Sequence, residues 1–162
     1  MMRHTLVKVG RTNTTYFKAG ASDYKGRLSN YARIEVLTVR KQHNPGQPSC
    51  HQRQEIVKKH SQALADSAPE TASTYWIALD ERGKQTTSEN LAKFIDLRAS
   101  RGHSHMVWFI GGPLGLSDEF LSRCRLSLSL SRMTFPHEMV PMILLEQIYR
   151  AHKISAGEPY HR

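Results

Sequence analysis

The sequence predicts an α/β fold in which helices flank a mainly parallel sheet. Short β-branched or apolar runs alternate with helix-like segments along almost the whole chain. Residues 106–110 are apolar throughout, which is typical of a central strand covered on both faces. Two punctuated turns, 111–117 and 129–137, each follow an apolar run and precede a helix. Turns of this kind at strand ends often bind a small ligand.

Three strands and two helices are expected in the first half of the chain. Residues 5–9, 34–39 and 75–79 are short runs with the composition of strands, and the third stops at Asp80-Glu-Arg-Gly83. One helix is expected from Thr14 or Thr15 to about Leu28, and another over residues 55–64. Residues 40–52 contain Asn-Pro-Gly-Gln-Pro and are interpreted as a mobile loop.

The second half continues the alternation with two strands and three helices. Ser88 is expected to cap a helix over residues 89–99, and Ser117 a short helix to about residue 124. Strands are expected at 106–110 and 126–130. Pro136 suits the first turn of a last helix that continues to about residue 154. Pro141 would crowd that helix, so a kink or a delayed helix start is predicted there.

Length and composition indicate a single cytoplasmic domain over residues 1–162. The hydrophobic fraction is 39%, and no run approaches the roughly 20 apolar residues that a membrane span needs. The first residues lead directly into a strand-like run and do not resemble a signal peptide. Cys50 and Cys124 are therefore expected to be free thiols, and neither they nor the nine histidines have the spacing of a metal site.

The positive charge is concentrated in the first part of the chain. Residues 1–60 hold 12 Lys or Arg and 3 Asp or Glu, a net charge of +9, whereas residues 61–162 hold 11 of each. Such asymmetry favours a polyanionic partner, with nucleic acid as the leading candidate. A general contribution to solubility is the alternative interpretation.

Each turn taken alone has an ordinary structural explanation. Gly111-Gly-Pro-Leu-Gly115 has neither the dinucleotide-binding spacing nor the Gly-Lys-Ser/Thr of a phosphate-binding loop, and by itself indicates only a strand-to-helix turn. The serine-rich segment 129–137 offers backbone groups to a ligand, but would also serve to cap the following helix. No set of residues with the spacing of a hydrolase is present.

Taken together, several motifs resemble the RlmH family of the SPOUT superfamily of RNA methyltransferases. They are Val9-Gly10, Leu79-Asp80 with Gly83-Lys84, Ile110-Gly-Gly-Pro-Leu-Gly-Leu116, Leu128-Ser-Leu-Ser-Arg-Met-Thr-Phe-Pro-His137, Glu146-Gln-Ile-Tyr-Arg-Ala151 and Glu158-Pro-Tyr-His-Arg162. The resemblance extends over nearly the whole chain. It implies a C-terminal deep trefoil knot within about residues 75–162, although chains rarely knot. It also implies a homodimer.

The resemblance implies S-adenosylmethionine as cofactor and N3 of a pseudouridine in helix 69 of 23S rRNA, within the assembled ribosome, as target. It implies neither a metal nor a membrane. The residues expected to bind the cofactor are Leu79, Gly111, Gly112, Gly115, Leu130, Ser131, Arg132, Met133, Thr134 and Phe135.

The catalytic residues expected from the resemblance are at the end of the chain. Tyr160 would stack on the target base, His161 would accept or relay its proton, and Arg162 would hold a phosphate or a uracil oxygen. Arg150 is either part of this set or an ion-pair residue at the dimer interface. A SPOUT enzyme with another RNA target, or a non-catalytic ribosome-assembly factor, are the alternatives.

The sequence departs from the family pattern at a few positions. Pro141 stands where relatives usually carry a basic residue, and Lys59-His60 where an acidic residue followed by glycine is common. The 44–49 loop is also poor in acidic residues. These changes are expected to affect RNA docking more than the cofactor pocket.

Overall fold

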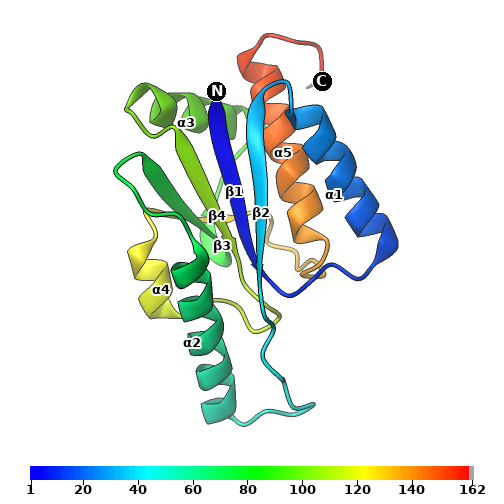
Figure 1. Ribbon diagram of the computed structural model, residues 1–162, viewed down its shortest axis with the longest axis vertical. Helices are drawn as coiled ribbons and strands as arrows, with labels where there is room; N and C mark the ends of the chain where they lie inside the picture. The colour runs from blue at the N-terminus through cyan, green and yellow to red at the C-terminus, as the bar shows by residue number, and fades with distance from the viewer. Residues whose placement is uncertain (161–162) are drawn as a thin grey trace.

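The computed structural model describes residues 1–160 and contains a five-stranded parallel sheet, which confirms the predicted fold class. The strands lie in the order β2-β1-β4-β3-β5 (Figure 1). Their bounds are Met2–Val9 for β1, Ala32–Val39 for β2, Thr74–Gln85 for β3, His105–Ile110 for β4 and Leu126–Ser129 for β5. This order carries the chain from β4 across β3 to the sheet edge, and the knot within about residues 75–162 stays a prediction.

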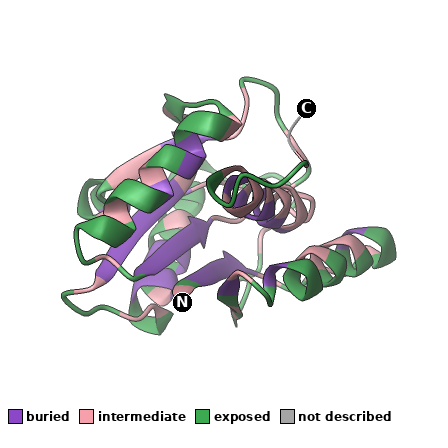
Figure 2. Cartoon of the chain, turned by 90° about the horizontal axis from the view of Figure 1, so that it is seen from above, coloured by how far each residue is buried: buried purple, intermediate pink, exposed green. Residues whose placement is uncertain are grey.

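Five helices cover the two faces of the sheet. They are α1 (Thr15–Leu28), α2 (Cys50–Ser67), α3 (Ser88–Ser100), α4 (Asp118–Arg123) and α5 (Val140–Ser155). Side chains alternate across a strand, so Leu6 and Trp108 pack with α1, α3 and α5, whereas Val7 and Phe109 pack with α2 and α4. Figure 2 shows that buried positions concentrate on the strands between these layers. Within residues 1–160, every helix is too short or too polar to cross a bilayer.

Several predicted boundaries are wrong by a few residues, because side-chain caps decide where helices begin. Helix α2 begins at Cys50, because Ser49 and Gln52 form a reciprocal capping box. Both residues fall within the segment 40–52 that the sequence predicts to be a loop. Thr87, not Ser88, caps α3 by accepting a hydrogen bond from the Asn90 N–H. Helix α5 does not include Pro136. It begins at Val140 with Pro141 in its first turn, which confirms the predicted delayed start.

Strand β3 continues past the expected stop at Asp80 because residues 80–83 loop out and the strand then resumes. Leu79 and Lys84 both pair with Leu128 of β5, so the intervening residues form an irregular bulge. Gly83 closes this bulge against the backbone of β5. A Cβ atom there would lie 2.7 Å from the Ser127 carbonyl carbon and 2.8 Å from the Leu128 nitrogen. Only glycine allows this approach.

We therefore expect Gly83→Ala to destabilise the protein by about 1–3 kcal/mol, because the added methyl must push two backbones apart. Gly26→Ala in α1 is the control, since a Cβ there meets nothing within 4 Å. That control should be neutral or stabilising by up to about 1 kcal/mol, because alanine favours helix. Urea denaturation measures both variants. Equal stabilities for Gly83→Ala and wild type would show that the bulge adapts freely.

A hydrogen-bonded histidine pair links the start of the sheet to α5. The Trp108 indole N–H donates to Nδ1 of His4 at 3.1 Å, so the His4 proton lies on Nε2, 3.1 Å from Nε2 of His152. His4 is fully buried. Burial, followed by the neighbouring His152 and His105, holds its pKa well below the ordinary value of 6.5. The imidazole is therefore neutral in the folded protein at neutral pH.

This arrangement predicts a loss of stability in mild acid. The unfolded chain takes up a proton on His4 as the pH falls through 6.5, whereas the folded chain does not. The free energy of unfolding should therefore fall by about 1.4 kcal/mol per pH unit below that value for each histidine kept neutral. Denaturation of wild type and His4→Asn, in which an amide oxygen can still accept from Trp108, tests this. The variant should show the shallower pH dependence, and identical slopes would contradict the role of His4.

Candidate functional site

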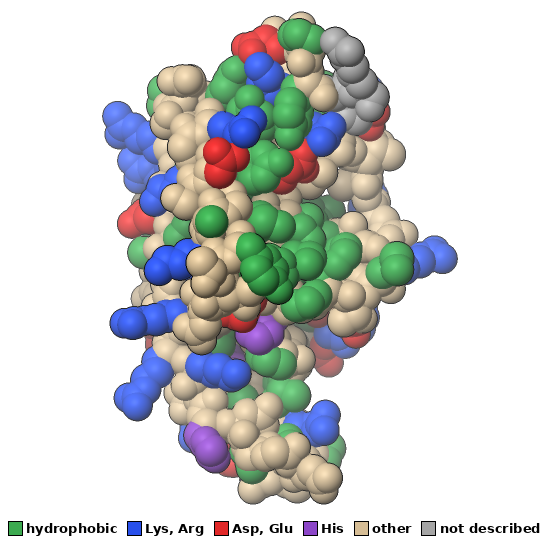
Figure 3. Space-filling view, turned by 90° about the vertical axis from the view of Figure 1, so that its right-hand side faces the viewer, with side chains coloured by type: hydrophobic (Ala, Val, Ile, Leu, Met, Phe, Trp, Pro, Cys, Tyr) green, Lys and Arg blue, Asp and Glu red, His purple; other side chains and the backbone are tan. Residues whose placement is uncertain are grey.

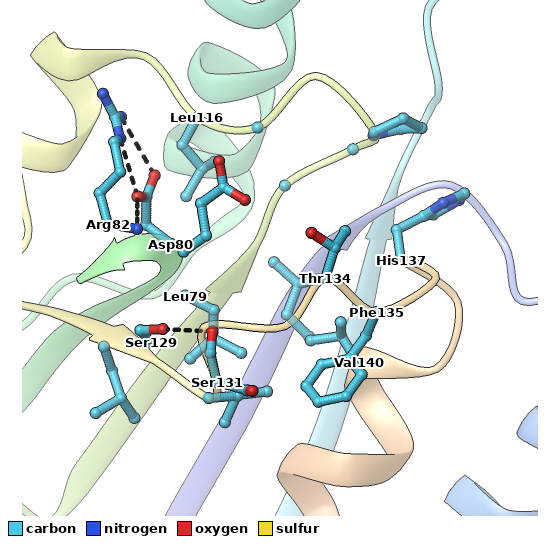
Figure 4. Close-up of a pocket in the computed structure, with 18 of the residues that line it drawn as sticks. Leu79, Asp80, Arg82, Leu116, Ser129, Ser131, Thr134, Phe135, His137 and Val140 are labelled. Carbon is cyan, nitrogen blue, oxygen red and sulfur yellow. Dashed lines mark hydrogen bonds and ion pairs between the residues drawn. The ribbon is translucent and has the colours of Figure 1, made fainter. Parts of the chain in front are cut away.

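A cavity of about 780 Å³ opens at the carboxyl ends of β3, β4 and β5 (Figure 4). Three chain segments that are distant in sequence form most of its wall: 79–82 at the bulge of β3, 110–116 from the end of β4, and 128–137 from the end of β5. Asp118 of α4 and Val140 of α5 complete it. The carboxyl ends of parallel strands meet at one edge of a sheet, which is why both punctuated turns of the sequence contribute to one site.

The glycine turn after β4 forms a closely packed wall. The Gly115 N–H donates to the Gly112 carbonyl at 3.0 Å, and Gly115 has a φ of +82°, a conformation that favours glycine. A Cβ on Gly111 would lie 3.0 Å from the Gly115 carbonyl group. Ser117 then fixes the turn. Its hydroxyl caps α4 at the Phe120 N–H, and its own N–H donates to the Ser61 hydroxyl of α2 at 3.0 Å.

The serine-rich segment after β5 forms a second wall through local hydrogen bonds. The Ser129 hydroxyl donates to the Ser131 carbonyl at 2.9 Å, and the Ser131 hydroxyl accepts from the Met133 N–H at 2.9 Å. Of the ten residues expected to bind the cofactor, nine line the cavity: Leu79, Gly111, Gly112, Gly115, Leu130, Ser131, Met133, Thr134 and Phe135. Arg132 is exposed and is not among the lining residues.

A charged network in the third wall was not singled out by the sequence interpretation. Arg82 binds the Asp80 carboxylate through its backbone N–H at 2.8 Å and through its guanidinium, which also donates to Asp118 of α4 at 3.2 Å. The Asp80 side chain is only 8% exposed. The hydrogen bonds that the Arg82 guanidinium donates to the Asp80 carboxylate raise the pKa of Arg82. The looped-out bulge is thereby tied to α4 at the cavity rim. Figure 4 shows the hydrogen bonds between Arg82 and Asp80.

Basic and imidazole groups lie beside the cavity at the carboxyl ends of β1 and β2. Lys8 is buried and donates from Nζ to the Gly10 carbonyl at 2.6 Å, and burial lowers its pKa. His137 lines the cavity, and burial and the nearby Lys41 lower its pKa. His60 accepts from the Gln42 N–H at 2.9 Å and lies against Gly112, where a Cβ would be 3.3 Å from its Nδ1. Lys8 and Lys41, together with the imidazoles of His60 and His137, border the cavity on this side. We call this border the basic margin.

Two residues of the expected catalytic set form a separate cluster on α5. The Tyr160 hydroxyl donates to Glu146 at 3.2 Å, its ring meets Tyr149 at 4.9 Å, and the Arg150 guanidinium lies 4.7 Å from that ring. Burial raises the pKa of Tyr160. Arg150 forms an ion pair with Glu146 of its own helix through Nε at 3.0 Å. His161 and Arg162 lie outside the described residues.

Within one chain this tail cluster lies away from the cavity. Arg150 is ten residues beyond Val140, which corresponds to about 15 Å along the helix axis. The end of α5 instead lies beside the amino-terminal ends of β1 and β2 (Figure 1). There the Tyr31 hydroxyl donates to Glu158 at 2.8 Å. Neither Arg150 nor Tyr160 lines the cavity. No group of three or more His, Cys, Asp or Glu in residues 1–160 is placed to hold a metal ion.

Comparison with known proteins assigns this architecture to a class. Residues 2–161 match the family model described as "Predicted SPOUT methyltransferase". The fold is similar to that of a probable methylase family protein from Haemophilus influenzae Rd KW20, with a TM-score of 0.54, 11% identity, and coverage of 99% of this chain and 70% of that one. A putative methylase family protein from Neisseria gonorrhoeae gives a TM-score of 0.51 at 16% identity, over 99% and 85% of the two chains. Fold and site thus define a SPOUT methyltransferase, an enzyme class that uses a methyl donor.

Closer relatives specify the branch of this class. The chain is 44% identical to "Ribosomal RNA large subunit methyltransferase H" of Carboxydothermus hydrogenoformans, over 99% of this chain and 100% of the relative. Proteins of the same name from Acetivibrio thermocellus and Clostridioides difficile are 40% and 42% identical, also over 99% and 100%. The chain therefore belongs to the RlmH family of SPOUT methyltransferases.

Proposed function

We propose that this protein transfers the methyl group of S-adenosylmethionine to N3 of a pseudouridine in helix 69 of 23S rRNA, within the assembled cytoplasmic ribosome. Family membership over the whole chain supports a large-subunit rRNA as substrate. The observation that carries the proposal is the cavity, because the glycine turn and the serine-rich segment, which are distant in sequence, both line it.

The cavity residues fit the proposed methyl donor. A volume of about 780 Å³ lies within the range of small-molecule sites. Gly111 and Gly112 line the cavity and pack closely on Gly115 and His60, where a Cβ would crowd both neighbours. The lining also combines apolar side chains such as Leu79 and Phe135 with Ser131 and Thr134. When bound, S-adenosylmethionine supplies a methyl group activated by its sulfonium. The chain's own residues hold the reactants in line and exclude water, which can supply roughly 7–11 kcal/mol of the barrier.

The basic margin beside the cavity is the proposed entry of the RNA. Lys8, Arg11 and Lys41 lie at the carboxyl ends of β1 and β2, within the part of the chain that carries the whole excess of positive charge. Arg11 lines a small recess that also includes Lys8, Gly111 and His137. Phosphate contacts from such residues position an RNA without reading its sequence.

The catalytic tail is proposed to act on the cavity of a second copy of the chain. Val140, Ile143, Gln147 and Arg150 recur every three or four residues and are only half-buried, so they share one side of α5. Figure 3, which views the side where α1 and α5 lie, shows an apolar area in the middle of this face. A two-fold axis across α5 would place the carboxyl end of one helix beside the amino end of its partner. Tyr160, His161 and Arg162 of one copy would then face the target base in the other, with Tyr160 stacking and His161 taking the proton.

This arrangement predicts complementation between two inactive variants. Thr134→Trp fills the cavity of one copy, and a chain ending at Pro159 lacks the tail. Heterodimers purified through two different tags should recover about half of the wild-type rate, because one of their two sites pairs an intact cavity with an intact tail. Circular dichroism checks that both chains are folded. No recovery in a confirmed heterodimer would show that each tail serves its own chain.

A second prediction concerns the glycine turn. Gly115→Ala should cost about 1–2 kcal/mol of stability because alanine disfavours positive φ, and should weaken S-adenosylmethionine binding roughly tenfold. Gly102→Ala is a matched control, since Gly102 has a φ of +88° with open space around it but lies at the other end of the sheet. It should lose similar stability and keep wild-type affinity. Calorimetric titration measures both, and equal affinities would remove the turn from the cofactor site.

The reaction itself is tested by mass spectrometry of rRNA from a deletion strain. One methyl group should be missing from helix 69 and should return on complementation. Its loss from another RNA would indicate a different target, and unchanged RNA together with undetectable cofactor binding would indicate a non-catalytic assembly factor.

A further inference from the structure

A cluster of cationic side chains surrounds Tyr75 at the amino-terminal edge of the sheet, opposite the cavity. We call it the Tyr75 cluster, and it consists of Arg98, His103 and Arg125 around that ring. The guanidinium carbons of Arg98 and Arg125 lie 4.9 Å and 5.6 Å from the ring centroid, and the His103 ring meets it edge-on at 5.2 Å. These residues come from the end of α3, the turn before β4 and the start of β5. The fold thus brings together three charges or potential charges that are distant in sequence.

The cluster has no acidic partner in the described part of the chain. Every ion pair formed within residues 1–160 involves other cations, and no carboxylate lies within 4.0 Å of Arg98 or Arg125. Arg125 Nη1 lies 3.5 Å from His103 Nε2, which must be the acceptor because arginine can only donate. The His103 proton is therefore on Nδ1. That nitrogen and Arg98 Nε are buried without a hydrogen-bond partner.

Stacking on Tyr75 accounts for the positions of the Arg98 and Arg125 guanidinium groups. It does not explain why these two positive charges lie near each other without an acidic partner. A guanidinium stacked by its face keeps its edge donors free, and the edge presents the fork that fits a phosphate. Arg101 is exposed in the turn next to His103, and Arg123 lies 5.2 Å from the Trp76 ring. The surroundings of the cluster are thus also cationic, although residues 61–162 as a whole carry no net charge.

We propose that the Tyr75 cluster binds the phosphodiester backbone of the RNA substrate, as a contact separate from the one at the cavity. This inference rests on the proposed function for the identity of the RNA. Strand β4 separates the cluster from the cavity by roughly 20 Å, at 3.3 Å per residue over His105–Ile110. A substrate that reaches both must be a large folded RNA rather than a nucleotide. The end of α5 lies at the same edge of the sheet, so an RNA that contacts Tyr160 would pass close to this surface.

The salt dependence of RNA binding tests the cluster directly. The double variant Arg98→Gln/Arg125→Gln is compared with Lys25→Gln/Arg27→Gln, which removes the same charge from α1, where Arg27 already pairs with Asp23. Affinity for a 23S rRNA fragment is measured by fluorescence anisotropy over a range of KCl concentrations. The slope of log affinity against log salt should become shallower by about 1.5–2 for two lost phosphate contacts, and the control should keep the wild-type slope.

Two further measurements keep the outcome unambiguous. Arg125 is exposed, so Arg125→Gln alone should fold normally even if the double variant is unstable. It should make the slope of log affinity against log salt shallower by the amount expected for one lost phosphate contact. S-adenosylmethionine affinity should be unchanged in all variants. Slopes equal to wild type in Arg125→Gln would overturn the proposal, as would a loss of binding to whole ribosomal subunits with no change on naked RNA. If the wild-type protein fails to methylate ribosomes, the proposed function falls, whereas the slope still reports on the cluster.

Discussion

The close approach of β3 and β5 at Gly83 is the constraint on which the site depends. Because two backbones touch there, β3 can resume its pairing after residues 80–83 have looped out of the sheet. The loop carries Asp80 and Arg82 to the rim, where Arg82 reaches α4. The same pairing sets the end of β5, from which the serine-rich segment starts. A side chain at position 83 would therefore displace two of the three walls of the cavity together.

The walls are held mainly by local hydrogen bonds and backbone conformation. Ser117 and Ser131 each fix a turn through a hydroxyl, and Gly115 supplies the one positive φ in the glycine turn. Such a scaffold is formed before a ligand arrives, which limits the ordering cost of binding. The proposed reaction requires alignment of its two reactants, and a preformed cavity suits that requirement.

Different kinds of functional groups lie at the two ends of the strands. Glycines, hydroxyls and neutral histidines gather at the carboxyl ends of the strands, whereas Tyr160, the His4–His152 pair and the Tyr75 cluster lie at the amino ends. A single chain therefore holds the expected cofactor site and part of the expected catalytic set on opposite sides. Association of two copies through α5 would resolve this separation, and a substrate as large as rRNA could contact both ends.

The sequence by itself determined the succession of strands and helices along the chain, the parallel character of the sheet and the two turns that line the cavity. These features follow from local patterns: alternation of segment types, apolar runs such as residues 106–110, and glycines that mark tight turns. Motif resemblance added the family, which the comparisons confirm, and the residues expected to bind the cofactor. The start of α2 at Cys50 was misplaced, because the Ser49–Gln52 capping box acts within one turn. The start of α5 at Val140 agrees with the delayed start expected from Pro141, although Pro136 lies outside the helix.

Only the tertiary structure decided which distant residues meet. The Asp80–Arg82–Asp118 network, the packing of His60 on Gly112 and the gathering of Arg98 and Arg125 on Tyr75 leave no periodic signal. The separation of Tyr160 from the cavity could likewise not be predicted from the sequence, because it depends on the direction in which α5 crosses the sheet. Contacts between segments depend on how strands are ordered in space, and that order is a property of the whole chain rather than of any local pattern.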